Sequence, residues 1–128
     1  MDVKQPFRPV FGERVQLQQA IINLILNAFD AVSIIDGPRE VRIEAGAAEG
    51  NNGVKILVHD SGKGIQPEDI SRIFDPFFTT KPKGMGMGLA IAKSIIETHG
   101  GTLSVALNSY RGTTFEIRLP NAHRDLSL

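Results

Sequence analysis

Apolar and polar positions repeat along the chain with a period that changes from one segment to the next. Over residues 13–34, apolar side chains recur at intervals of three and four, which predicts one long helix that ends at the turn sequence DGP, 36–38. Alternating apolar positions predict strands over 39–47 and 54–60. The remaining predicted elements are a short helix at 66–74, a helix at 89–99, and strands at 102–107 and 113–120.

The order of these elements predicts an α+β fold. Neighbouring strands are joined by short connections, which favours antiparallel pairs. We therefore expect a two-layer α/β sandwich, in which about three helices cover one face of a mixed, mostly antiparallel sheet. The 128 residues fit a single domain over 1–128, with a flexible tail at 121–128.

Composition and charge narrow the classes of function. The 14 basic and 14 acidic side chains balance, which argues against a non-specific nucleic-acid surface. The chain has no cysteine, which excludes disulfides and thiolate metal sites. No apolar run approaches the roughly 20 residues that span a bilayer, and the N-terminal residues do not resemble a signal peptide. We expect a cytoplasmic domain that makes no membrane contact.

The first predicted helix carries a narrow polar stripe in an otherwise apolar segment. Its members follow helical steps of three and four: Gln16, Gln19, Asn23, Asn27 and Asp30. The stripe is either the solvent side of the helix or the lining of a polar cavity. In the second case an asparagine oxygen suits a hard cation such as Mg²⁺.

A strand that ends in a carboxylate precedes the first pair of glycines. In VHDSGKGI, residues 58–65, Asp60 is followed by Gly62 and Gly64. Alternate glycines let a ligand approach the backbone closely, and the carboxylate can accept a hydrogen bond from an exocyclic amine such as that of adenine. A plain turn remains the alternative.

A second set of glycines leads directly into a helix. Gly84, Gly86 and Gly88 alternate just before the helix predicted at 89–99. The free N–H groups of a helix N-terminus bind anions, phosphate above all. The alternative is a flexible linker.

Three aromatic residues lie in the loop between these features. Phe74, Phe77 and Phe78 occur in RIFDPFFTTK, residues 72–81. Exposed aromatic clusters are a liability, so we expect them to pack in at least one state of a moving lid. Lys81 either reaches a phosphate or is an ordinary solvated lysine.

These segments, in this order, resemble the catalytic, ATP-binding domain of sensor histidine kinases. That family belongs to the Bergerat-fold or GHKL ATPases, with gyrase, the heat-shock chaperone ATPase and the mismatch-repair ATPases. The resemblance covers about residues 10–120. It is carried by NLILNAFDA at 23–31, DSGKG at 60–64, FDPFFTTK at 74–81, GMGMGLAIAKSIIETHGG at 84–101 and RGTTFEIRLP at 111–120.

The resemblance implies ATP and Mg²⁺ as ligands and assigns roles to individual positions. Asn27 would ligate Mg²⁺, Asp60 would bind the adenine amino group, and Thr113 would help to close the adenine end. Residues 66–87 would form the ATP lid. The implied ATP-binding set is Asn27, Asp30, Asp60, Gly62, Gly64, Ile65, Phe74, Thr80, Lys81, Gly84, Met85, Gly86, Met87, Gly88, Leu89 and Thr113.

One position of the resemblance bears on the reaction type. ATP-hydrolysing members and related serine kinases carry a glutamate one helical turn before the magnesium asparagine, where this chain has Asn23. Asparagine does not accept a proton at neutral pH. The catalytic pair Asn23 and Asn27 therefore implies phosphoryl transfer to histidine. The alternatives are a serine kinase of the anti-sigma type and a non-catalytic ATP-binding module.

The sequence departs from the family pattern at Asp30. Many histidine kinases have a lysine or arginine there that reaches the phosphates. We interpret Asp30 as a subfamily difference, which leaves Lys81 and Lys83 as the candidate phosphate cations.

A second departure is an absence. His59, His99 and His123 do not resemble the family's phosphoacceptor motif, and the first strand of the fold looks reduced to FRPVF at 7–11. We expect an excised, monomeric catalytic domain of a two-component kinase. Its phosphate acceptor would lie on a dimerisation domain of the parent protein, with a response regulator as the indirect partner. The parent itself is expected to be either soluble or membrane-anchored.

Overall fold

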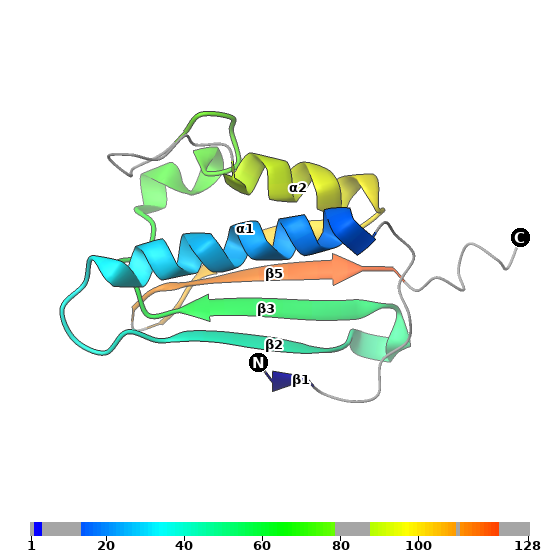
Figure 1. Ribbon diagram of the computed structural model, residues 1–128, viewed down its shortest axis with the longest axis horizontal. Coiled ribbons are helices and arrows are strands. Elements are labelled where there is room, and N and C mark those ends of the chain that lie inside the picture. Colours follow the sequence, from blue (N-terminus) through cyan, green and yellow to red (C-terminus); the bar gives the residue numbers. More distant parts are fainter. Residues whose placement is uncertain (1, 4–13, 79–87, 110, 121–128) are drawn as a thin grey trace, which may run out of the picture.

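The computed structural model describes residues 2–3, 14–78, 88–109 and 111–120 (Figure 1). Its strands are β1 (Asp2–Val3), β2 (Val41–Ala47), β3 (Val54–Asp60), β4 (Thr102–Leu107) and β5 (Thr113–Leu119). Its helices are α1 (Arg14–Ser33), α2 (Gly88–Thr98) and two short 3-10 helices, η1 (Glu49–Asn51) and η2 (Pro67–Arg72).

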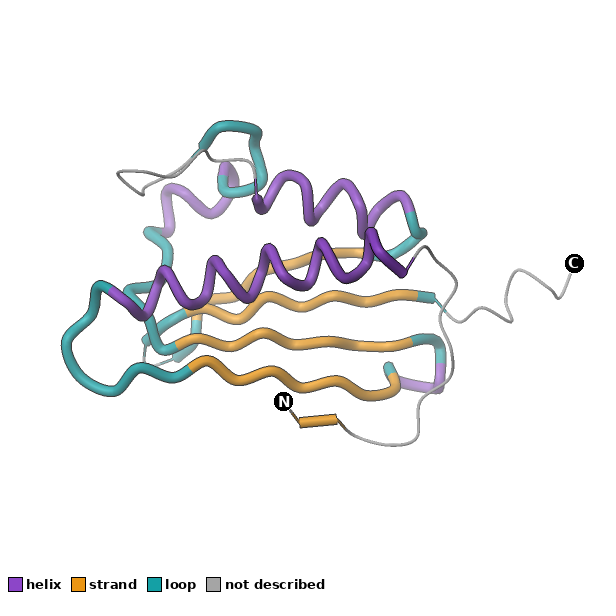
Figure 2. The backbone as a smooth tube through the Cα atoms, viewed as in Figure 1, coloured by secondary structure: helices purple, strands orange, loops and turns teal. Residues whose placement is uncertain are grey.

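The strands form one sheet in the order β1-β2-β3-β5-β4. β1 runs parallel to β2, and the other three pairs are antiparallel. Figure 1 and Figure 2 show α1, α2 and η2 together on one side of this sheet. The predicted two-layer sandwich with a mixed, mostly antiparallel sheet is confirmed.

The core lies between the sheet and the two long helices. Alternation buries every second residue of β5, including Phe115 and Ile117, against the helices. Leu24 of α1 and Ile96 of α2 are fully buried opposite them. Burial of each such side chain stabilises the fold by about 1.5–3 kcal/mol. This packing holds α1 and α2 in place over the sheet, and it therefore sets where their polar residues lie relative to the end of β3.

Most elements begin and end close to their predicted bounds. The segment predicted as a short helix at 66–74 is a 3-10 helix, with i to i+3 hydrogen bonds such as the one from the Asp69 N–H to the Gln66 carbonyl, 2.8 Å. Pro67 occupies its first turn, where the missing N–H costs nothing.

The first strand differs from the prediction. The structure places it at Asp2–Val3, in parallel register with Glu44 and Ala45, whereas the proposed remnant at 7–11 lies outside the described residues. Two paired residues give no periodicity to read, because their placement depends on backbone pairing with a strand about 40 residues away.

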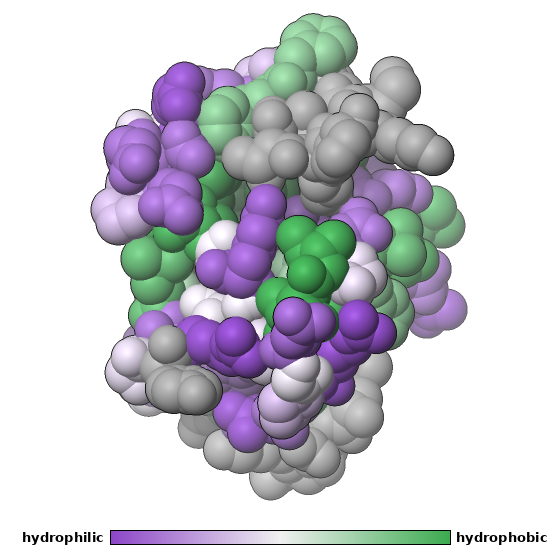
Figure 3. Space-filling model, turned by 90° about the vertical axis from the view of Figure 1, so that its left-hand side faces the viewer, coloured by the Kyte–Doolittle hydropathy of each residue, from purple (hydrophilic) through white to green (hydrophobic). Residues whose placement is uncertain are grey.

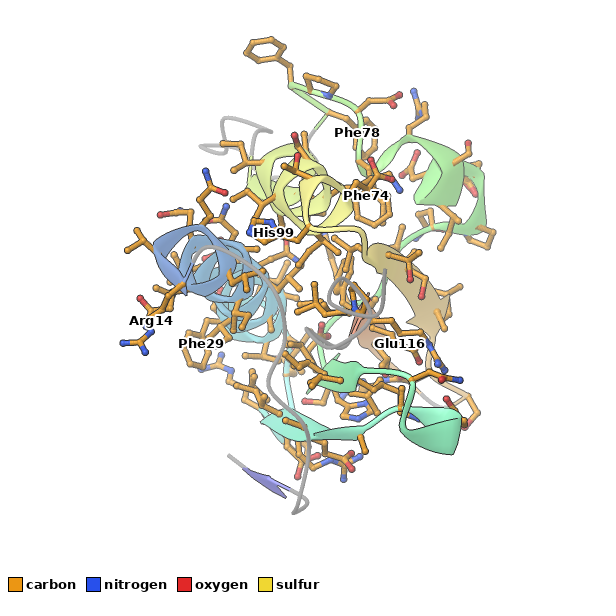
Figure 4. All side chains as sticks on the ribbon, turned by 90° about the vertical axis from the view of Figure 1, so that its right-hand side faces the viewer. Arg14, Phe29, Phe74, Phe78, His99 and Glu116 are labelled. Carbon is orange, nitrogen blue, oxygen red and sulfur yellow. The ribbon has the colours of Figure 1, made fainter. Side chains whose placement is uncertain are left out.

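The apolar positions of α1 that flank its polar stripe are not all buried. Four apolar side chains of this helix are each about half exposed or more: Val15, Ile22, Leu26 and Phe29. The labelled Phe29 points away from α2 in Figure 4. A helix that packs on one sheet and one neighbouring helix buries only the faces that touch them. The outward face is therefore free to be apolar without being buried.

Within the described part of the chain, no helix is both long enough and apolar enough to cross a membrane.

Candidate functional site

The end of β3 places the Asp60 carboxylate in a buried position. Asp60 is 4% exposed, and one of its oxygens accepts a 2.8 Å hydrogen bond from the Gly62 N–H. Burial raises the pKa of the Asp60 carboxyl above its ordinary value. Hydrogen bonds from the Gly62 and Thr113 backbones, followed by the charge of His59, act against that rise in pKa. A buried acceptor of this kind suits a ligand that brings its own hydrogen-bond donor.

The turn after Asp60 can be formed only with small residues. A Cβ built on Gly62 would lie 2.6 Å from the backbone carbonyl of Ala31 in α1, and Gly64 has φ +78°. Gly62 therefore allows the segment after β3 to pass close to the last turn of α1, and Gly64 turns the chain away. Ile65 follows, partly buried against the core.

Thr113 begins β5 directly opposite Asp60 in the sheet register. It is 3% exposed, and it lies on the same strand face as Phe115 and Ile117. Asp60, Gly62 and Thr113 thus meet at one end of the sheet, where β3 ends and β5 begins. Figure 3 faces this end of the molecule, where the surface is hollowed and pale, near-neutral residues lie at the base of the hollow.

The polar stripe of α1 runs toward the same region, and its two asparagines differ in their bonding. Asn23 accepts a hydrogen bond from Gln19, 2.9 Å, and donates one to the carbonyl of Gly88, 3.2 Å. It therefore ties α1 to the first residue of α2. Asn27 is partly buried, and among the described residues its amide side chain has no hydrogen-bond partner.

The donor set around Asn27 fits Mg²⁺ held jointly by protein and substrate. The described residues contain no group of three or more acidic, histidine or cysteine side chains that would hold a metal alone. A single amide oxygen with free coordination positions suits a magnesium ion that keeps waters and binds phosphates. Asp30, on the same stripe, is exposed.

The glycine-rich segment is only partly within the described residues. Gly88 is the first residue of α2 and Leu89 the second, and Leu89 packs against the core. Nothing would obstruct a Cβ on Gly88 within 4 Å. The other predicted residues of this segment lie outside the described residues: Thr80, Lys81, Gly84, Met85, Gly86 and Met87.

The three phenylalanines of the preceding loop do not behave alike. Phe74 packs edge-on against Phe115, with ring centroids 6.2 Å apart, and Arg72 lies 4.8 Å over the Phe78 ring. Figure 4 shows Phe74 and Phe78 near one another beside α2. Phe77 is 71% exposed and has φ +70°, an unusual conformation for a bulky residue.

A shallow groove lies beside Phe74, away from Asp60. It runs between the loop and one face of α2, and it is lined by Phe74, Pro76, Ala90, Lys93, Ser94, Glu97 and Thr98. Phe74 is its single member from the predicted binding set, and its ring carries Lys93 at 5.0 Å. We therefore place the candidate site at the end of β3 and not in this groove.

Sequence reasoning missed the loop that supports Asp60 from the other side. A Cβ on Gly112 would lie 1.9 Å from the Asp60 carbonyl oxygen, and Asn108 donates a hydrogen bond to the same carbonyl, 3.1 Å. The glycine before the last strand was the one available signal. Asn108 gave none, because asparagine is ordinary in a turn between strands.

Comparison with known proteins places the chain in context. Residues 12–123 match the family model described as histidine kinase-, DNA gyrase B-, and HSP90-like ATPase. The sensor histidine kinase ZraS of Escherichia coli K12 is 47% identical over 105 residues, which cover 82% of this chain and 22% of ZraS. The chain thus spans about a fifth of the length of such curated relatives.

Solved structures show the same architecture. The catalytic domain of histidine kinase ThkA matches with a TM-score of 0.79 at 32% identity, over 94% of this chain and 76% of the other. Full-length ShkA in complex with AMPPNP matches with a TM-score of 0.78 at 28% identity, over 94% of this chain and 25% of ShkA.

Proposed function

Since the chain belongs to the histidine kinase-, DNA gyrase B- and HSP90-like ATPase family, we propose that it binds Mg-ATP and donates the γ-phosphate to a histidine. That histidine lies on a separate dimerisation domain of a parent sensor kinase, from which the phosphate passes to a response regulator. Asn23 and Asn27 are the catalytic residues of this proposal.

The buried Asp60 carboxylate is the observation that carries the proposal. The backbones of Gly62 and Thr113 donate hydrogen bonds to this carboxylate, and its oxygens have further lone pairs that would accept from the amino group of adenine. A site built to accept from an exocyclic amine rejects a base that lacks one, because the buried acceptor would then be unpaired. ShkA, a structural relative, was solved in complex with AMPPNP, which supports a nucleotide at this site.

Asn27 would hold the magnesium ion through its side-chain oxygen. When bound, Mg²⁺ neutralises phosphate charge. The position of Asn27 on the polar stripe of α1, partly open to solvent, supports this role, because its amide oxygen can reach a bound cation. Gly88 and Leu89, at the start of α2, would offer backbone N–H groups to the phosphates.

Asn23 favours a histidine acceptor over water. Its amide is used in hydrogen bonds to Gln19 and Gly88, and it offers no base for a water or serine hydroxyl. A neutral imidazole nitrogen needs no base. The unprotonated ring nitrogen attacks the γ-phosphorus, the bond from this phosphorus to its bridging oxygen breaks, and ADP leaves. A phosphorus–nitrogen bond forms, and the proton on the second ring nitrogen is lost to solvent.

The remaining parts of the proposal concern the parent protein. We expect this domain to act in the cytoplasm as a monomer, without nucleic-acid or membrane contact, whether its parent is soluble or membrane-anchored. The kinase ThkA was solved in complex with the response regulator TrrA, which supports a response regulator as the indirect partner of this chain.

Labelled phosphate transfer tests the proposal. The chain is mixed with ATP labelled in the γ-phosphate, Mg²⁺, and the parent's dimerisation domain supplied separately. We expect acid-labile label on that domain, and we expect Asn27→Ala to abolish the dependence of transfer on Mg²⁺. ATP binding without transfer would instead support a non-catalytic module, and acid-stable label on serine would support a serine kinase.

A further inference from the structure

The face of the sheet opposite the helices carries a continuous chain of hydrogen bonds that ends at Asp60. Side chains alternate along a strand, so His59 of β3 and Thr114 of β5 point to this face while Asp60 and Thr113 point to the helices. His59 and Thr114 are register partners. Glu44 of β2 lies on the same face.

Asn108 lies in the turn between β4 and β5, and both its side-chain nitrogen and its side-chain oxygen form hydrogen bonds. Its nitrogen donates to the carbonyl of Asp60, 3.1 Å, and to the carbonyl of Arg111, 3.2 Å. Its oxygen accepts from the Thr114 hydroxyl, 2.6 Å. The amide therefore bridges the end of β3 and the turn that leads into β5.

His59 and Glu44 extend this set of hydrogen bonds beyond Thr114. The Thr114 hydroxyl oxygen lies 2.8 Å from Nδ1 of His59, and Nε2 of His59 lies 2.9 Å from a carboxylate oxygen of Glu44. The His59 ring therefore links side chains of β2, β3 and β5 on this face of the sheet.

Backbone packing joins the same two segments. Gly112 has φ +89°, and a Cβ there would lie 1.9 Å from the Asp60 carbonyl oxygen. The peptide after Asp60 is therefore held between the Gly112 backbone and the Asn108 amide. The Asp60 side chain leaves the backbone beside this peptide and points to the opposite face of the sheet, so a shift of the peptide would displace the carboxylate.

We propose that Asn108 is a positioning residue for base recognition, which holds the Asp60 peptide so that its carboxylate faces the adenine amino group, and that Thr114 and His59 hold Asn108 in turn. The proposal rests on the proposed nucleotide binding. It adds a specificity role for residues that would not touch the nucleotide.

Two nucleotides separate this role from simple stabilisation. ATP and purine riboside triphosphate, which is ATP without the 6-amino group, are titrated against the wild type and the Asn108→Ala variant. We expect Asn108→Ala to weaken the binding of ATP about tenfold and to change the affinity for the amine-free nucleotide little. Discrimination between the two therefore falls. Asn52→Ala, a turn asparagine near the other end of β3, is the matched control and should change neither affinity.

A pair of substitutions at Thr114 tests the hydrogen-bond chain itself. Thr114→Ser keeps the hydroxyl and loses the branched strand side chain, whereas Thr114→Val does the reverse. If Asn108 positions Asp60, the Thr114→Val variant discriminates less between ATP and the amine-free nucleotide, and the Thr114→Ser variant discriminates as well as the wild type. A purely structural role for Thr114 requires the opposite order, because β-branched residues favour strands.

The outcomes are separable. If Asn108→Ala folds poorly, the Thr114 pair decides the question. Equal weakening of both nucleotides, or unchanged discrimination in Asn108→Ala and Thr114→Val, overturns the positioning role. Failure of the wild type to bind either nucleotide overturns the proposed function instead.

Discussion

Burial of the Asp60 side chain disfavours the charged form of its carboxyl group. Burial at the end of β3 removes the Asp60 carboxylate from water, which raises its pKa. Two backbone N–H groups donate hydrogen bonds to the carboxylate and lower the pKa, but the effect of burial is larger. A buried carboxylate of this kind destabilises the domain without a ligand and stabilises the complex with a ligand that donates a hydrogen bond to it. This behaviour is typical of a binding site. Glu49 shows the reverse case: its side chain pairs with Arg118, whose hydrogen bonds lower the Glu49 pKa to about 2.

The sign of these two shifts predicts opposite effects of pH on stability. An acid with a raised folded pKa contributes most stability below its unfolded value, about 3.9 for Asp. This contribution is lost as pH rises through the folded pKa. We expect the unfolding free energy of Asp60→Asn to increase relative to that of the wild type as pH rises above about 4.

Glu49→Gln is the matched control for that experiment. The lowered pKa of Glu49 contributes stability above its unfolded value of about 4.3, and this stability is lost as pH falls toward about 2. The side chain is 68% exposed, so the effect is small after solvent screening. Urea unfolding across pH measures both. A difference between Asp60→Asn and wild type that does not change with pH would contradict the burial argument.

At the scale of elements, the sequence predicted helices and strands better than it predicted their surroundings. The periods over 13–34 and 54–60 gave α1 and β3 within a residue, because periodicity reports which face meets the core. The same periods did not predict that Ile22 and Leu26 are exposed. An apolar residue in the sequence does not indicate whether another element of the fold packs over it. Asn108 was missed because its hydrogen bond to the Asp60 carbonyl joins residues that are 48 positions apart in the sequence.

Two leucines two positions apart on α1 test this distinction. Leu24 is fully buried and Leu26 is 54% exposed. We expect Leu24→Ala to lower the free energy of unfolding by about 2–5 kcal/mol and Leu26→Ala to change it by less than about 0.5 kcal/mol. Denaturant unfolding measures both. Similar losses in the two variants would mean that the outward face of α1 is covered.

Two glycines test how closely the elements approach at the site. A Cβ on Gly62 would collide with the Ala31 backbone, whereas a Cβ on Gly88 would meet nothing within 4 Å. We expect Gly62→Ala to cost about 3 kcal/mol and Gly88→Ala to be neutral or stabilising by up to about 1 kcal/mol. Thermal unfolding compares them. A Gly62→Ala variant as stable as Gly88→Ala would show that β3 and α1 are less tightly joined.

At the scale of the molecule, one end of the sheet collects the parts of the site from distant segments. β3 supplies Asp60, β5 supplies Thr113, α1 supplies Asn23 and Asn27, and α2 begins there at Gly88. Figure 1 shows the end of β3 and the start of β5 on the same side of the molecule as the last turn of α1. The motifs indicated each part, since each has a local sequence pattern. Their supports on the far face of the sheet have no such pattern and needed the structure.

The most direct test of the central claim is a calorimetric titration of the chain with ATP in the presence of Mg²⁺, compared with the Asp60→Asn variant. We predict one ATP bound per wild-type chain and binding at least about tenfold weaker in Asp60→Asn, with the fold unchanged by circular dichroism. Equal ATP affinity in the two proteins, or no binding by the wild type, would contradict the account.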